Sequence, residues 1–230
     1  MYNLSQKLLA EFIGTFTLVF IGEGSVCADQ YLHASGASGS GLLAIAAAHG
    51  LALAILISAV GHISGGHLNP AVTIGFWVTK KISTLDALSY WVAQVAGAIV
   101  AAYLLTVVIP EATWRAVGLG TPDLATDFTR FHGIVLESIT TFLLVFVVFA
   151  TAADPKGAFN KIAGFPIGLT VMMGILVSGP FTGGAMNPAR AFGPALIAHH
   201  WTNHGVYWVG PLIGGVVAGW LYNSFLLKES

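Results

Sequence analysis

Charged residues are scarce in this chain of 230 residues: Asp, Glu, Lys and Arg make up 8% of it, and hydrophobic residues make up 56%. Soluble domains carry about 25% charged residues, so this composition indicates an integral membrane protein. The formal net charge at pH 7 is only −1, which suggests no nucleic-acid partner. The single cysteine, Cys27, excludes an internal disulfide and any cysteine-based metal site.

Long apolar stretches take the place of the missing charges. A hydrocarbon core of about 30 Å requires about 20 apolar residues in a helix. Six stretches reach roughly that length, at residues 7–28, 41–62, 86–109, 132–152, 161–179 and 204–227. The first resembles a signal peptide, but no small-residue cleavage site clearly follows it, so we expect a retained helix. We therefore predict an all-α integral membrane protein with six transmembrane helices in the lipid bilayer.

The tripeptide Asn-Pro-Ala occurs twice in matching contexts, at residues 69–71 and 187–189. Asn favours the position before a helix and Pro favours the first helical position, so each copy predicts a helix start. The apolar stretches that follow, 71–79 and 189–199, have about ten residues each. Ten helical residues rise about 15 Å, which is half of the hydrocarbon core. We predict two re-entrant half-helices.

The lysines indicate the orientation in the membrane. With six spans both termini share one side, and the lysines then fall on that side: Lys7, Lys80, Lys81, Lys156, Lys161 and Lys228. Arg115, Arg130 and Arg190 fall on the other side or within the pore. Cytoplasmic loops carry an excess of Lys and Arg, so we expect both termini in the cytoplasm.

The two halves of the chain resemble each other. The pattern Glu-x-x-x-Thr-Phe-x-Leu-Val-Phe begins at Glu11 and again at Glu137. We divide the chain into a first repeat, 1–115, and a second repeat, 116–230, which together form one pore domain. Each has three spans and one half-helix, and because three is odd the second repeat must be inverted. The two half-helices then meet with their N-termini near the midplane.

The two Asn-Pro-Ala motifs, the paired Glu-x-x-x-Thr-Phe segments and Arg190 after the second motif together resemble the aquaporin (major intrinsic protein) family. The resemblance covers essentially the whole chain. It implies a passive water channel in a homotetramer, with one pore in each protomer. No enzyme signature stands out in the sequence, and we expect no cofactor and no metal site.

Asn69 and Asn187 are the residues expected at the centre of the pore. Two facing helix N-termini, each with about half a positive charge, repel cations, including hydronium. Each side-chain amide can donate to a passing water, which then points its hydrogens away from the centre and interrupts proton hopping. The backbone carbonyls expected to replace lost hydration are those of Gly65, Gly66, His67, Gly183, Gly184 and Ala185.

Three glutamates lie within the predicted spans, where ionisable residues are functional by default. We expect Glu11 and Glu137 to accept hydrogen bonds from backbone N–H groups of the re-entrant loops, as the resemblance also implies. The alternative is a carboxylate that reaches the membrane interface. Glu23 has no counterpart in the second repeat, where Phe149 stands, and could face the outer vestibule or the lipid headgroups.

The resemblance implies a constriction of four residues on the outer side: His49, Ile175, Gly184 and Arg190. This set is similar to that of certain plant tonoplast intrinsic proteins, which pass ammonia as well as water. Gly184 contributes no side chain to the ring, and Ile175 contributes no polar group. We therefore expect the ring to be wider than in a strict water channel. His49 can hydrogen-bond neutral ammonia, and Arg190 should repel ammonium. His49 could instead be a helix-packing histidine.

Three other functions stay open at this point. A facilitator of urea or glycerol is one. The resemblance argues against glycerol, because glycerol facilitators of the family usually have Asp where Ala191 stands and lack the aromatic pair Tyr207-Trp208. A proton-coupled secondary transporter is another, since inverted repeats and membrane glutamates also mark those proteins. A structural or adhesive membrane protein would need a defective pore, yet both motifs and Arg190 are intact.

The outer loops carry two further expectations. His199, His200 and His204 could be drawn as a metal cluster, but no carboxylate lies near them in the sequence. We therefore expect a solvated loop there. The long loop 110–131 could cover the outer mouth and supply another selectivity residue, which the sequence does not locate.

Overall fold

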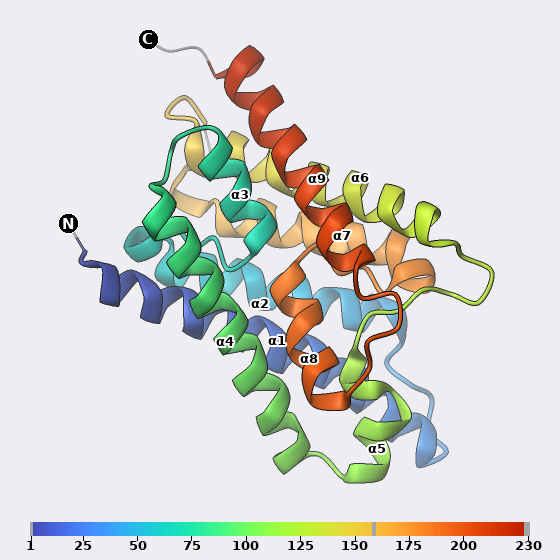
Figure 1. Cartoon of the computed structure of the whole chain (residues 1–230). Coiled ribbons are helices and arrows are strands. Elements are labelled where there is room, and N and C mark those ends of the chain that lie inside the picture. Colours follow the sequence, from blue (N-terminus) through green and yellow to red (C-terminus); the bar gives the residue numbers. More distant parts are fainter. Residues whose placement is uncertain (1, 158–159, 228–230) are drawn as a thin grey trace.

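Every regular element is a helix in the computed structural model, which describes residues 2–157 and 160–227 (Figure 1). Within the described residues, six helices are long and apolar enough to cross a membrane, two of them together with the π-helical turn that follows. They are α1 (Leu4–Ala34), α2 (Gly41–Ser64), α4 (Thr84–Val108), α6 (Arg130–Val148), α7 (Gly164–Thr182) and α9 (Val206–Leu221). The π-helical turns η2 (Phe149–Ala153) and η4 (Tyr222–Leu226) extend α6 and α9. The chain is thus an integral membrane protein that crosses the bilayer several times.

The long helices agree with the predicted spans except at some of their ends. The largest difference is in α1, which continues past the predicted end at residue 28 because nothing in the more polar segment 29–34 breaks a helix. It ends where Gly36 takes a left-handed conformation, with φ of 81°. The last predicted lysine, Lys228, lies outside the described residues.

Two short helices, α3 (Pro70–Val78) and α8 (Pro188–Ala198), confirm the predicted half-helices. Each begins with Pro at its first position. The side-chain Oδ1 of Asn69 accepts a hydrogen bond from the Ala71 N–H at 2.8 Å, and Asn187 accepts one from Ala189 at 3.0 Å. These caps satisfy backbone donors that a helix start would otherwise leave unpaired inside the protein.

The helices pack in two matching sets. Helix α1 packs against α2 and α4, and α6 packs against α7 and α9 in the same way. Each short helix then packs on the last long helix of the other set, α3 on α9 and α8 on α4. The two sets also meet where α2 crosses α7, at Gly50 and Gly168, since a side chain on either glycine would collide with the backbone of the other.

The two ends of the chain lie on one side of the molecule, at the upper left in Figure 1. The segment between α4 and α6 lies at the opposite side and contains two helices that the sequence did not predict, α5 (Glu111–Ala116) and η1 (Gly118–Gly120). The predicted boundary between the repeats, after residue 115, falls inside α5. Leu119 is fully buried against Cys27 and Leu105, so η1 is anchored on α1 and α4.

Candidate channel site

The N-termini of α3 and α8 meet inside the protein. The amide Nδ2 of Asn69 donates to the Met186 carbonyl at 2.8 Å, and Nδ2 of Asn187 donates to the Leu68 carbonyl at 2.9 Å. An amide nitrogen carries two hydrogens, so each asparagine keeps one donor for a solute. The partial positive charges of both helix ends add at this point.

The segment before α3 is held by Glu11 of α1, whose side chain is fully buried. Its carboxylate accepts from the backbone N–H groups of His67 at 2.9 Å and Leu68 at 2.6 Å. The side chains of Ser64 and Gln94 donate to the same carboxylate at 2.6 and 2.7 Å. A carboxylate that reaches the membrane interface does not fit this geometry.

Glu137 of α6 holds the segment before α8 in the corresponding way and is also fully buried. It accepts from the N–H groups of Ala185 at 2.9 Å and Met186 at 2.7 Å, and from the Thr182 hydroxyl at 2.7 Å. Met186 has a left-handed backbone, with φ of 49°, and Leu68 in the other segment has φ of 51°. Such a conformation is costly for a residue with a side chain, and the bonds to the carboxylates help to hold it.

A narrow cavity passes both asparagines and offers about 20 Å³ to the centres of water molecules. Since one water needs about 10–15 Å³ of such space, only small solutes fit. All four predicted constriction residues line it, as do Gly66, His67, Gly184 and Ala185 of the loops. Apart from the two asparagines, its other lining residues are all apolar: Leu18, Leu53, Ile57, Val72, Leu144, Val148, Ile167, Val171 and Met186.

Two of the six predicted carbonyl residues do not line this cavity. Gly65 lies in a separate hollow beside Lys161 and Gly164. The carbonyl of Gly183 faces Arg190, whose Nη1 donates to it at 3.3 Å. The hydrogen bond from Nη1 to the Gly184 carbonyl is shorter, at 2.8 Å. These two carbonyls therefore hold the side chain of Arg190 in place.

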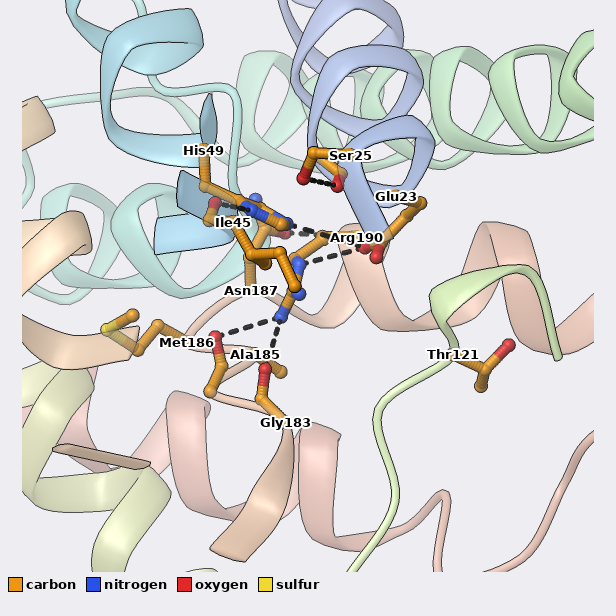
Figure 2. Close-up of polar contacts among 12 residues, drawn as sticks. Glu23, Ser25, Ile45, His49, Thr121, Gly183, Ala185, Met186, Asn187 and Arg190 are labelled. Carbon is orange, nitrogen blue, oxygen red and sulfur yellow. Dashed lines mark hydrogen bonds and ion pairs between the residues drawn. The ribbon is translucent and has the colours of Figure 1, made fainter. Parts of the chain in front are cut away.

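Glu23, whose position the sequence left open, faces neither the outer vestibule nor the lipid headgroups. Its side chain is fully buried, and its Oε1 lies 2.9 Å from Nε of Arg190 (Figure 2). Burial of a lone carboxylate is very costly, so the guanidinium provides the compensating charge. Sequence reasoning missed this pair, because its members lie in distant segments. The only signal was an acid within a span that had no counterpart in the other repeat.

His49 of α2 is fully buried beside the same carboxylate. Its Nδ1 lies 2.8 Å from the Ile45 carbonyl, and its Nε2 lies 3.9 Å from Oε1 of Glu23 (Figure 2). A carbonyl only accepts, so Nδ1 carries a hydrogen, and in the tautomer with a single ring hydrogen Nε2 is an acceptor. The ring packs against Gly22, where any side chain would overlap it.

The loop that carries the outer histidines is exposed or partly exposed, and a carboxylate from another segment of the chain reaches it. Nε2 of His200 lies 2.7 Å from Oδ2 of Asp123, a carboxylate that is far away in the sequence. Asn203 donates to Oδ1 of the same Asp123 at 3.1 Å. His204 accepts from the indole N–H of Trp208 at 3.0 Å, and partial burial lowers the pKa of His204. Among the described residues, no three His, Cys, Asp or Glu side chains could share a metal ion.

Six membrane-crossing helices around a narrow cavity, with two half-helix N-termini at its centre, define a membrane channel for small solutes. The family model of the major intrinsic protein family matches residues 1–222. The chain belongs to this family. Because its members are channels, the family supports the expectation that the protein is not an enzyme.

Plant proteins are among the similar sequences. "Probable aquaporin TIP3-2" of Arabidopsis thaliana is 46% identical over 97% of this chain and 85% of its own length. "Aquaporin TIP2-2" of Zea mays is 48% identical over 98% of this chain and 89% of its own. The aquaglyceroporin from Plasmodium falciparum has the same fold, with a TM-score of 0.81 and 23% identity over 97% of both chains.

Proposed function

We propose that the protein is a passive water channel that excludes protons and also conducts ammonia. The observation that carries the proposal is the pair of asparagine amides at the meeting point of α3 and α8, each with one donor left for a solute. A water that accepts from both would turn its hydrogens away from the centre, which interrupts a proton wire. The names of the similar plant proteins, which are aquaporins, also support water as the permeant.

Ammonia conduction follows from the polarity of the constriction. Nε2 of His49 can accept an N–H of ammonia, and an N–H of Arg190 can donate to the ammonia lone pair. Ile175 and Gly184 offer no competing side-chain donor on the remaining sides. Ammonia therefore finds both a donor and an acceptor where it loses its hydration.

The double substitution His49→Phe with Ile175→His tests this assignment. We expect ammonia flux to fall several-fold more than water flux, because the acceptor beside Arg190 is removed and the ring becomes narrower. The measurement compares, in one liposome preparation, internal alkalinisation by ammonia with shrinkage in a sucrose gradient. An equal loss of both fluxes would count against the assignment of these residues to the constriction.

The assembly and the orientation are proposed on other grounds. We place both termini in the cytoplasm, because they lie on one side of the molecule (Figure 1) and lysines predominate on that side of the predicted topology. A homotetramer and a repeat boundary near residue 115 are also proposed. The alternative function is a facilitator of small neutral solutes such as urea or glycerol. Two features disfavour glycerol: Ala191 and the pair Tyr207-Trp208.

A further inference from the structure

Glu23 lies behind the constriction, on the side of Arg190 that faces α1. Its carboxylate is covered from outside by η1, where a side chain on Gly120 would come within 2.6 Å of Oε2. Gly120 also has a left-handed backbone, with φ of 70°. A glycine is thus required at the place where the outer loop closes over this carboxylate.

The guanidinium of Arg190 is held from two directions (Figure 2). Its Nη1 donates to the carbonyls of Gly183 and Gly184, and its Nε lies against Oε1 of Glu23 at 2.9 Å. Neither oxygen of Glu23 has a hydrogen-bond partner of good geometry among the described residues, so the contact with Arg190 is one of charge. In a buried site such an attraction is much stronger than in water.

We propose that Glu23 is a further specificity-determining residue of this channel, acting through Arg190. It holds the guanidinium against the wall, away from the lumen, and it cancels much of the positive charge there. The constriction then selects by width and hydrogen bonding, and the rejection of ammonium and other cations falls mainly on the half-helix N-termini at Asn69 and Asn187. This inference rests on the proposed water channel.

The test is Glu23→Gln, which keeps the shape of the side chain and removes its charge. The guanidinium would lose one of its two anchors and its compensating charge, and would turn toward the water in the lumen. We expect the water flux per channel to fall about fivefold, which equals about 1 kcal/mol of added barrier. The activation energy of the flux, from its temperature dependence, should rise accordingly.

The activation energy separates this role from a structural one. A variant that only folds less well has fewer channels. This lowers the channel-mediated flux, measured as the excess over protein-free liposomes, and leaves the activation energy of that excess flux unchanged. Glu111→Gln is the matched control, because Glu111 is an exposed acid that pairs with Arg115 on the same side of the molecule. We expect the water flux of Glu111→Gln and its activation energy to equal those of the unmodified protein. Glu23→Asp keeps the charge on a shorter side chain. Its activation energy of water flux should lie between those of Glu23→Gln and the unmodified protein.

A double-mutant cycle with Arg190→Gln tests whether Glu23 acts through the arginine. Each loss of water flux is expressed as an added free-energy barrier. The barrier added in the double variant should be smaller than the sum of those added in the two single variants, because the two residues are in contact. Additive losses, or an unchanged activation energy in Glu23→Gln, would overturn the inference. Should Glu23→Gln not fold, Glu23→Asp decides, and an activation energy equal to that of the unmodified protein would overturn it. Absence of water flux in the unmodified protein would instead contradict the proposed function.

Discussion

Glu137→Leu should abolish water flux and lower the melting temperature of the protein in detergent by many degrees. Leucine is apolar and offers no hydrogen-bond acceptor. The substitution leaves the N–H groups of Ala185 and Met186 and the Thr182 hydroxyl without their partner inside the protein. Each buried group left unpaired costs about 1–3 kcal/mol. The segment that positions Asn187 and Arg190 would then lose its shape.

Two companion variants sharpen this prediction. Glu137→Gln offers one acceptor oxygen, and its NH₂ group faces donors, so we expect an intermediate melting temperature. Glu111→Leu removes an acid that is exposed at the outer side and should leave melting and flux nearly unchanged. A Glu137→Leu protein with normal melting and flux would show that the carboxylate does not support the loop.

Gly168→Ala is expected to separate α2 from α7 and to destabilise the protein nearly as strongly. A methyl group on Gly168 would overlap the carbonyl oxygen of Gly50, and one on Gly50 would lie 2.6 Å from the carbonyl oxygen of Gly168. The obstacle is backbone, so no side-chain rotation can relieve it. Overpacking of this kind costs about 1–3 kcal/mol, and more when helices must move. Lower thermal stability and lower water flux are the expected results.

Gly61→Ala provides the matched control in the same helix as Gly50. The nearest atom to an added methyl group there belongs to Ile57, at 3.7 Å, an ordinary contact. We expect no loss, and a small gain, because alanine favours a helix by about 1 kcal/mol over glycine. Equal melting temperatures for Gly168→Ala and Gly61→Ala would contradict the close packing of α2 on α7.

The fold could be predicted where its causes are local. Asn-Pro-Ala carries both a helix cap and a helix start, so the beginnings of α3 and α8 followed from three residues each. The long spans followed from their lack of charge. The left-handed backbone at Leu68 and Met186 could not be predicted, because neither residue is a glycine and the bonds that hold it come from distant glutamates.

The site was less predictable where two distant segments meet. The pairing of Glu23 with Arg190, and that of Asp123 with His200, joins residues whose separation in the chain gives no sign of contact. Apolar patterning shows that Glu23 lies within a span and does not show which way it points. The constriction residues came from the family resemblance, and their part in selectivity stays a prediction.

The channel function is tested most directly by the flux of three solutes through the purified protein in liposomes. Water flux is followed as stopped-flow shrinkage in a sucrose gradient, ammonia flux as internal alkalinisation, and glycerol flux as swelling, each against protein-free liposomes. We expect fast water and ammonia flux and slow glycerol flux. Water flux no greater than in protein-free liposomes would contradict the channel function.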